Sequence, residues 1–315
     1  IGSNTIIELK KSSYKIIILD NLINSSLKQL TKIRKLFKKK IIFIRDDIRN
    51  KSINKIFHKY NINAVIHFAG LKSVKESEFK KKMYFDNNIN GTLNLLESMK
   101  KNKCYNIIFS SSACVYDSSA KPPYNEKSKL NPKSFYGYTK LKNEKILQNF
   151  SYKNPRFNCI ILRYFNPIGT DKSGLLNDDP KKPENIIPKI MNVIKGKNKI
   201  FDIYGQDYPT KDGTCLRDYI HISDLAKSHV KSLKLLKNNI FQIINIGTGV
   251  PYSVKDVLDV FNKYLTTKIK YRYKSKRVGD VPICFSNVKK QKKILNFKPK
   301  FNLNNMIKNI VEIQK

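Results

Sequence analysis

The chain of 315 residues is short of arginine, of acidic residues and of long apolar runs. Only eight of its 62 basic residues are Arg, although the net charge is +38. Arg is the side chain that usually recognises phosphates and base edges. Because the chain is also rich in Asn and Ile throughout, we interpret the charge as compositional drift toward Lys. We therefore expect no nucleic-acid partner.

The five cysteines form no Cys-x-x-Cys pair, and their number is odd. This argues against a disulfide framework and a structural zinc site, so we predict no metal and expect a reduced, cytoplasmic compartment. No apolar run approaches the ~20 residues of a membrane span, and no signal peptide is visible. The chain begins at Ile1 rather than Met, and we expect a further segment before it.

Short β-branched runs alternate with helical patterns along the chain. Predicted strands cover residues 15–19, 40–45, 64–68, 106–110, 158–162 and 242–246, and predicted helices cover residues 27–39, 53–60, 88–101 and 135–150. Such alternation is typical of crossover units around a parallel sheet. We predict an α/β fold, namely a Rossmann-type doubly wound parallel sheet with a smaller mixed α/β domain.

Two domains are predicted from where this alternation weakens. Gly and Pro cluster between Pro167 and Pro209, and a strand pattern returns near residue 242. We assign residues 1–166 to a dinucleotide-binding domain, which the chain re-enters around residues 218–248. Residues 167–217 and 249–315 form the predicted substrate domain.

Asp20 stands at the end of the first visible strand, where a dinucleotide fold places an acid on the adenosine ribose. A carboxylate there repels a 2′-phosphate and favours NAD over NADP. Gly2 lies upstream at about the spacing expected for the last Gly of a phosphate-binding turn. The strand and earlier glycines of that turn would precede Ile1. Asp20 fits an ordinary strand-end cap equally well.

Two further strand ends carry similar signals. Asp47 and Ile48 follow a strand and are candidates for the adenine edge. Gly70 follows another strand and would allow backbone to approach the pyrophosphate closely. His67 lies inside the same apolar run, so we interpret it as a hydrogen-bonded core histidine rather than a ligand.

A Tyr-x-x-x-Lys spacing places both side chains on one helix face, where the ammonium can stabilise a tyrosinate. About three matches are expected by chance from this composition. The chain contains three, which are Tyr136/Lys140, Tyr138/Lys142 and Tyr264/Lys268. The first two open a helix downstream of the cluster Ser110–Ser112. They lie on different faces, so at most one is catalytic.

Seven segments together resemble the extended short-chain dehydrogenase/reductase superfamily, and within it the nucleotide-sugar epimerases of the NAD-dependent epimerase/dehydratase family. The resemblance runs in order along nearly the whole chain. Its segments are Asp20–Ser25, Val65–Lys72, Asp86–Thr92, Phe109–Ala113, Arg163–Pro167, Asp207–Thr210 and Arg217–His221. It implies that the two predicted domains bind NAD and a UDP-sugar.

The resemblance also implies roles for individual residues. Tyr136 matches the general base, Lys140 its partner, and Ser112 the serine that bonds the reacting hydroxyl. Implied cofactor positions are Ile1, Gly2, Asp20, Asn21, Asn24, Ser25, Asp47, Ile48, Phe68, Ala69, Gly70, Lys72, Asn87, Tyr136, Lys140 and Phe165. Implied substrate positions are Lys72, Ser112, Tyr136, Asn166, Asn185, Ile186, Tyr204, Arg217, Arg277, Asp280 and Cys284.

The activity implied by this resemblance is the interconversion of UDP-galactose and UDP-glucose by reversible oxidation at C4, as in galactose metabolism. Related 4,6-dehydratases carry an Asp-Glu pair after the serine cluster, where this chain has Ala113 and Cys114, so dehydration is disfavoured. Alternatives are another NAD-dependent nucleotide-sugar epimerase, dehydratase or decarboxylase, or a basic binding protein that keeps the fold without catalysis.

Two narrower expectations concern substrate range and assembly. Cys284 falls where the family has either a bulky Tyr or a small residue beside the sugar's C2 substituent. A small side chain leaves room for an N-acetyl group, so activity on UDP-GalNAc and UDP-GlcNAc is predicted. The alternative is that Cys284 only packs. The family is usually dimeric through a helix bundle, and a homodimer is expected.

Overall fold

The computed structural model describes residues 1–176, 184–277 and 279–313, and these form two compact units. Unit 1 comprises residues 1–119, 126–164 and 226–245. Unit 2 comprises residues 120–125, 165–225 and 246–315. The chain therefore passes between the units more than once, and each is described by itself.

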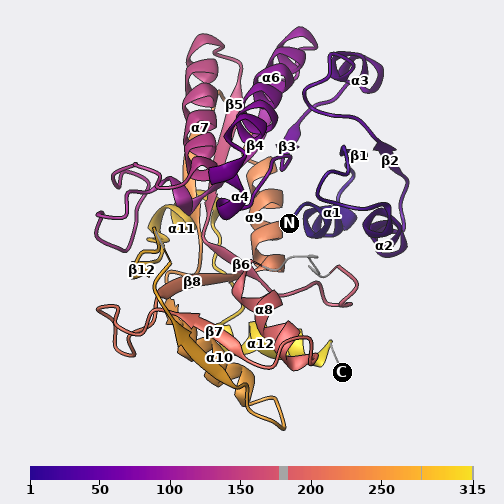
Figure 1. The fold of residues 1–315 in the computed structure, drawn as a ribbon. Helices are drawn as coiled ribbons and strands as arrows, with labels where there is room; N and C mark the ends of the chain where they lie inside the picture. The colour runs from indigo at the N-terminus through magenta and orange to yellow at the C-terminus, as the bar shows by residue number, and fades with distance from the viewer. Residues whose placement is uncertain (177–183, 278, 314–315) are drawn as a thin grey trace. The chain divides into compact units, whose positions relative to one another are not determined.

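Unit 1 alternates strands and helices as the sequence predicts (Figure 1). Its elements are α1 (Gly2–Glu8), η1 (Leu9–Lys11), β1 (Ile16–Leu19), α2 (Leu27–Phe37), β2 (Ile41–Ile44), α3 (Ile53–Tyr60), β3 (Val65–His67), α4 (Val74–Phe79), α5 (Lys81–Phe85), η2 (Asp86–Asn90), α6 (Gly91–Lys101), β4 (Asn106–Ser112), η3 (Ala113–Val115), α7 (Phe135–Lys153), β5 (Asn158–Tyr164), most of α9 (Ile222–Leu233) and β9 (Phe241–Ile246).

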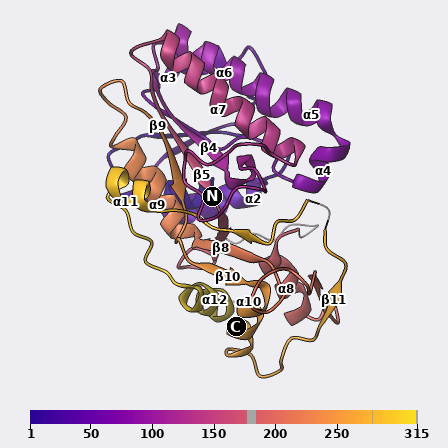
Figure 2. The same cartoon turned by 90° about the vertical axis from the view of Figure 1, so that its left-hand side faces the viewer.

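The main sheet of unit 1 has the order β3-β4-β5-β9, with β3, β4 and β5 parallel. Strands β1 and β2 form a separate parallel pair. Figure 2 shows α6 and α7 together on one face of the main sheet and α9 on the opposite face. The doubly wound parallel sheet predicted from the alternation is confirmed, because helices cover both faces.

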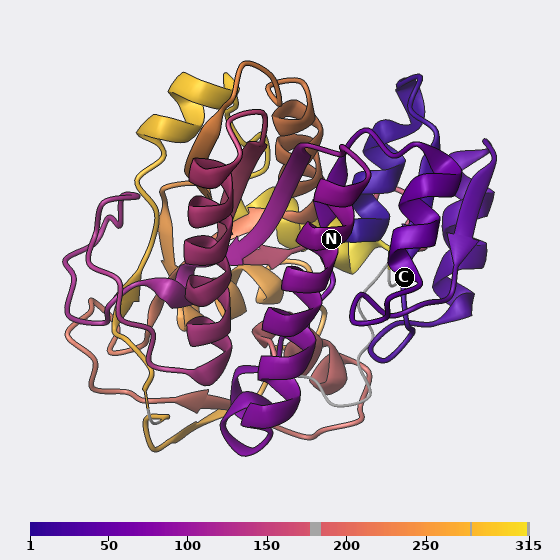
Figure 3. The same cartoon turned by 90° about the horizontal axis from the view of Figure 1, so that it is seen from above.

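Strand β4 is one of the two inner strands of this sheet, and its Ile and Phe side chains are fully buried. Ile107 and Phe109 pack in one cluster with Leu95 of α6, Leu147 of α7 and Ile161 of β5. Figure 3 shows the helices of residues 91–101 and 135–153 running side by side over these strands. The packing fixes α7 against β4, and with it the Tyr and Lys of the predicted site.

Unit 2 is built around β8. Its elements are β6 (Asn166–Ile168), α8 (Ile186–Ile194), β7 (Phe201–Tyr204), β8 (Leu216–His221), β10 (Pro251–Ser253), α10 (Val254–Asn262), β11 (Tyr271–Lys274), β12 (Ile283–Cys284), α11 (Lys289–Leu295) and α12 (Leu303–Glu312). Strand β8 pairs with β10 antiparallel and with β6 and β12 parallel, while β7 pairs with β11. Apolar side chains of α10 and α12 close the core of this unit.

No helix within residues 1–176, 184–277 and 279–313 is both long and apolar enough to cross a membrane. All five cysteines are described, and none forms a disulfide.

Candidate active site

Helix α7 brings Tyr136 to the end of β4 through a close backbone approach. The helix begins after Ser134, whose hydroxyl accepts a hydrogen bond from the Gly137 amide at 3.0 Å. A Cβ on Gly137 would lie 2.5 Å from the carbonyl oxygen of Cys114, so any larger residue would push the helix away. Glycine at this position therefore lets the first turn of α7 rest on the segment that follows Ser112.

Lys140 lies one turn after Tyr136, and its ammonium is buried. Its Nζ donates to the carbonyl oxygen of Ser110 at 2.7 Å and lies 5.8 Å from the Tyr136 ring centroid. Burial lowers the pKa of Lys140 to about 8, and the carboxylate of Glu144 opposes that shift. The lysine thus keeps its charge at neutral pH without a direct ion pair to any described residue.

The other two Tyr–Lys pairs sit differently. Tyr138 is 41% exposed and packs on Phe135, while Lys142 is exposed. Tyr264 packs against the core of unit 2. Of the three pairs, only Tyr136 and Lys140 face the serine cluster.

Tyr136 is protonated at neutral pH in this structure. Burial raises the pKa of its hydroxyl above the usual range, and the nearby Cys114 thiol acts in the same direction. A hydrogen bond with Ser112 acts the other way and is the weaker influence. The phenol therefore needs a positive charge close by before it can act as a base.

The predicted adenosine positions form one connected group at the ends of β1 and β2. Asp20 Oδ1 accepts hydrogen bonds from the Leu22 amide at 2.7 Å and the Ser25 hydroxyl at 2.8 Å. Asn21 donates to the Asp47 carboxylate at 2.7 Å. The second carboxylate oxygen of Asp20 has no partner among the described residues, and an acceptor there fits the ribose hydroxyls of NAD.

Gly70 links this group to the catalytic cluster. The Asn24 amide donates to the Gly70 carbonyl at 3.3 Å, and a Cβ on Gly70 would lie 3.8 Å from Lys140 Nζ. That Cβ would also come within 3.3 Å of the Asn88 amide oxygen. Beside it, Phe68 packs against Gly2, whose added Cβ would lie 3.4 Å from the ring. Unit 1 therefore brings the predicted phosphate and nicotinamide positions together.

His67 is a core histidine, as predicted. Its Nε2 lies 2.9 Å from the Thr92 hydroxyl, and burial lowers its pKa to about 3. The remaining cofactor positions are varied: Ile48 and Asn87 are buried, Ile1 is partly buried, Ala69 and Lys72 are exposed, and Phe165 belongs to unit 2. Asn87 lies in the π-helical turn η2, and the helix predicted from the sequence begins one residue later, at residue 88.

In unit 2, Arg217 and Asp280 form an ion pair at 2.8 Å. The Arg217 Nη1 also donates to the carbonyl oxygens of Val281 and Leu216. Cys284 pairs with Arg217 in the β8–β12 register. These three predicted substrate residues therefore lie side by side, and much of the guanidinium's donor capacity already has protein partners.

Tyr204 of β7 stands between two cations. The Arg277 guanidinium lies 4.0 Å from its ring centroid, and Lys189 Nζ lies 5.3 Å from it. Lys189 belongs to α8, whose first residue is the predicted site residue Ile186 and whose N-cap is Asn185. Asn166 donates to the Asp218 carbonyl oxygen at 3.1 Å.

Two charged residues were missed by the sequence analysis. Glu144 and Arg163 form an ion pair at 2.6 Å, and their side chains are 3% and 1% exposed. A signal for each was present. Glu144 follows Lys140 by one helical turn, and Arg163 is a lone charge after the apolar run Ile160–Leu162 of a buried strand. A charge in such a strand requires a buried partner.

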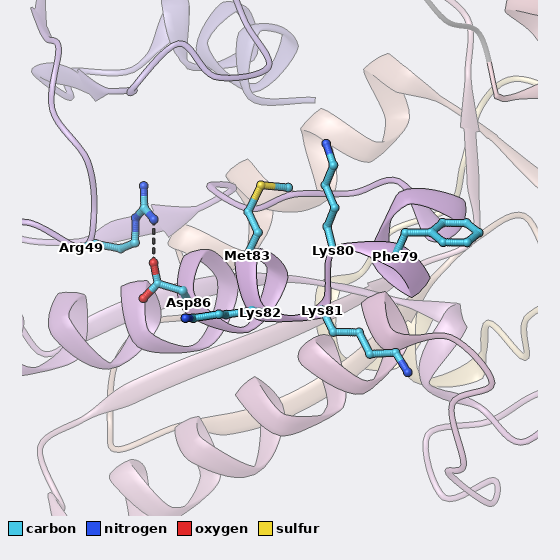
Figure 4. Close-up of a pocket in the computed structure, with 7 residues that line it drawn as sticks. All are labelled: Arg49, Phe79, Lys80, Lys81, Lys82, Met83 and Asp86. Atoms are coloured by element: carbon cyan, nitrogen blue, oxygen red, sulfur yellow. Dashed lines mark hydrogen bonds and ion pairs between the residues drawn. The ribbon is translucent and has the colours of Figure 1, made fainter.

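One hollow on the described surface lies away from these groups (Figure 4). It has a volume of about 480 Å³ and is lined by Arg49, Phe79, Lys80, Lys81, Lys82, Met83 and Asp86. Arg49 and Asp86 pair there at 2.6 Å. None of the lining residues is a predicted site residue. In the part of the chain that the structure describes, no three His, Cys, Asp or Glu gather around a common point for a metal ion.

A parallel sheet with a Tyr and a Lys one turn apart beside a strand-end serine defines a dinucleotide-dependent enzyme that moves a proton and a hydride. A family model described as the NAD dependent epimerase/dehydratase family matches residues 1–247. The chain belongs to this family.

Individual relatives agree with this assignment. The UDP-glucose 4-epimerase of Dictyostelium discoideum is 43% identical over 310 residues, covering 97% of this chain and 90% of the relative. A crystal structure of UDP-glucose 4-epimerase from Bifidobacterium longum in complex with NAD+ and UDP is 39% identical, with a TM-score of 0.94 over 99% of this chain and 94% of that one. The UDP-glucose-4-epimerase of Stenotrophomonas maltophila, with bound NAD and formylated UDP-arabinopyranose, is 32% identical with a TM-score of 0.96 over 99% and 94%.

Proposed function

We propose that this chain interconverts UDP-galactose and UDP-glucose through reversible oxidation at C4 of the sugar, with bound NAD. The observation that carries the proposal is the placement of Tyr136 and Lys140 one turn apart on α7, facing the serines that end β4. The relatives described above, which are UDP-glucose 4-epimerases matching nearly the whole chain, support the same reaction.

Tyr136 is the proposed base for the 4-hydroxyl proton, and Ser112 the group that orients that hydroxyl. Lowering the pKa of a phenol from ~10 to ~7 requires about 4 kcal/mol. A cation about 6 Å away supplies about 3 kcal/mol at an effective dielectric near 20. Lys140 therefore supplies part of the requirement, because its ammonium stabilises the phenolate that forms, and the raised pKa of the buried phenol adds to that requirement. When bound, NAD+ supplies the acceptor for the C4 hydride and a second positive charge.

The residues that would hold the two ligands lie in separate parts of the chain. In unit 1, Asp20 offers an acceptor to the ribose, and Gly70 gives close backbone access beside Lys140. In unit 2, Arg217 and Arg277 are two of only eight Arg, and a guanidinium is the donor best matched to a diphosphate. Tyr204 holds the Arg277 guanidinium against its ring and is proposed to position that donor.

The reaction is tested by incubating the purified protein with UDP-galactose and no added NAD, and separating the nucleotide sugars by chromatography. We expect UDP-glucose to accumulate to an equilibrium mixture. The same protein, once denatured, should release NAD into the supernatant. Protein that carries NAD and leaves UDP-galactose unchanged would refute the proposed reaction.

We also propose activity on UDP-GalNAc, because Cys284 is a small side chain next to the proposed substrate residue Arg217. We expect turnover of UDP-GalNAc within about tenfold of that of UDP-galactose. Since a bulky ring would occupy the space for the N-acetyl group, Cys284→Tyr should abolish this activity and retain the activity on UDP-galactose. Both substrates should be assayed by chromatography with the wild type and with the variant. If the variant keeps its activity on UDP-GalNAc, the N-acetyl group does not lie beside Cys284.

A homodimer is proposed for the face formed by α5 and α6, with a second copy of the chain as its partner. Phe85 and Leu93 are 39% and 41% exposed there, and apolar side chains exposed together on one face can mark an interface. Leu93→Asp should shift the protein from dimer to monomer in sedimentation velocity, whereas Tyr152→Asp, at an 89% exposed site on α7, should leave the dimer intact. Monomeric wild-type protein at micromolar concentration would contradict the proposal.

We also propose that the protein works in the cytoplasm, a reducing compartment in which its five cysteines would stay as free thiols, as they are in this structure. We propose that the large positive charge does not bind nucleic acid, since 54 of the 62 basic residues are Lys and only a few are Arg.

A further inference from the structure

The buried ion pair of Glu144 and Arg163 lies directly next to the residues that hold Lys140. Arg163 donates from Nε and Nη2 to the Glu144 carboxylate, at 3.0 and 2.6 Å. The hydroxyl of Ser111 donates to the same carboxylate at 2.5 Å. Ser111 and Arg163 lie opposite each other in the β4–β5 register, so each of the two strands provides one hydrogen-bonding partner for the Glu144 carboxylate.

The neighbouring residue of β4 holds Lys140 in the same way. Lys140 donates to the carbonyl oxygen of Ser110, while Glu144 accepts from Ser111. Lys140 and Glu144 are one helical turn apart on α7, and Ser110 and Ser111 are consecutive on the strand. Two consecutive residues of β4 therefore form hydrogen bonds with the side chains at the two ends of one turn of α7.

The other titratable groups around Lys140 stabilise its positive charge less than Glu144 does. Tyr136 is a neutral phenol, and His67 on β3 is neutral because it is buried. Cys114 of η3 favours the charged lysine less than Glu144 does. Among the described groups, Glu144 is thus the main anion that faces Lys140.

We propose that Glu144, held by Arg163 and Ser111, is a positioning residue that keeps Lys140 charged and directed at Tyr136. The inference rests on the proposed function, because it explains how the lysine required for that reaction stays protonated in a buried site. Side chains one helical turn apart lie roughly 6 Å from each other, and a carboxylate at that distance is worth about two pH units at an effective dielectric near 20. Arg163 stays in place in Glu144→Gln, so a shift of about two units is expected of that variant.

The first readout is stability, which needs neither substrate nor cofactor turnover. Burial holds the pKa of Lys140 at about 8 in the folded protein, below its ordinary value of 10.5. The unfolded chain therefore binds more protons between these values, so the stability deficit caused by Lys140 is complete below pH 8 and shrinks as pH rises from 8 to 10.5. Glu144→Gln lowers the folded pKa further and enlarges the deficit at low pH only. We expect the gap in urea midpoint between wild type and Glu144→Gln to narrow from pH 6 to pH 9.

The second readout is the pH dependence of kcat. Loss of the lysine's charge ends turnover at high pH, so the alkaline limb should move to lower pH by about two units in Glu144→Gln. Glu312→Gln is the matched control, because it makes the same change at a 60% exposed carboxylate on α12 of unit 2, whereas Lys140 belongs to unit 1. It should change stability by the same small amount at pH 6 and pH 9 and leave the alkaline limb in place.

The outcomes separate this inference from the proposed function. A constant stability gap and an unmoved limb in Glu144→Gln would overturn the role of Glu144 and leave the epimerase assignment standing. Wild-type protein without epimerase activity would overturn the assignment, while the stability measurement would still report on Glu144. If Glu144→Gln fails to fold, the double variant Glu144→Gln/Arg163→Met leaves no unpaired charge. A narrowing in the same direction is expected of it, and it should be smaller because a cation near Lys140 is removed as well.

Discussion

Tyr136→Phe should lower kcat for UDP-galactose by at least about 100-fold, the low end of what a positioned acid–base group contributes. The variant keeps the ring that packs beside Lys140 and removes only the hydroxyl. Substrate affinity should change little, because the proposed UDP-binding residues belong to unit 2. Steady-state kinetics measure kcat and KM separately and test both expectations.

Tyr138→Phe is the matched control for this experiment. Tyr138 lies two residues further on the same helix, heads the competing pair with Lys142 and is 41% exposed. Its variant should keep kcat within about twofold of wild type, since surface changes away from special features have small effects. If Tyr138→Phe loses activity and Tyr136→Phe does not, the proposed base is the wrong tyrosine.

Arg163→Met should cost about 3–5 kcal/mol of unfolding free energy, the usual effect of removing one member of a buried ion pair. The Arg163 side chain is only 1% exposed and also donates to the Tyr116 hydroxyl at 3.1 Å. Methionine of similar length fills the volume and leaves the Glu144 carboxylate without its cation. Urea unfolding followed by circular dichroism measures the loss at pH 7.

Adding Glu144→Gln to Arg163→Met should recover roughly half of that loss, because no uncompensated charge then remains in the core. A double variant less stable than Arg163→Met alone would mean that the cost comes from lost packing. In that case the electrostatic account of this pair would be wrong.

Much of the fold is predictable from hydrophobic pattern. The predicted helix at residues 53–60 coincides with α3, and the strand at 242–246 is one residue shorter than β9. Predicted strands 106–110 and 158–162 are each two residues too short. At both ends the apolar run gives way to polar residues, Ser111 and Arg163, which are buried because they pair with Glu144. Periodicity cannot predict a partner on another element.

The site, like the fold, is predictable from the sequence only in part. Sequence spacing leaves Tyr136 and Tyr138 as equal candidates, and only the close contact of Gly137 with Cys114 decides which of them faces β4. The π-helical turn at Asp86–Asn90 likewise overlaps the start of the predicted helix at residues 88–101, where the sequence pattern indicates a regular helix. Its buried Asn88 accepts from the Leu71 amide at 2.8 Å, a tertiary contact that local propensity does not report. The roles of the individual site residues stay predictions.

The reversible oxidation at C4 is tested most directly by following the hydrogen on that carbon. Purified protein should be given UDP-galactose carrying deuterium at C4, with no added NAD, and the product analysed by mass spectrometry and NMR. The hydride that leaves C4 must return to C4, so we predict that the UDP-glucose formed retains the deuterium at that carbon. Loss of the deuterium to water would contradict a hydride mechanism and the roles assigned to Tyr136 and Lys140.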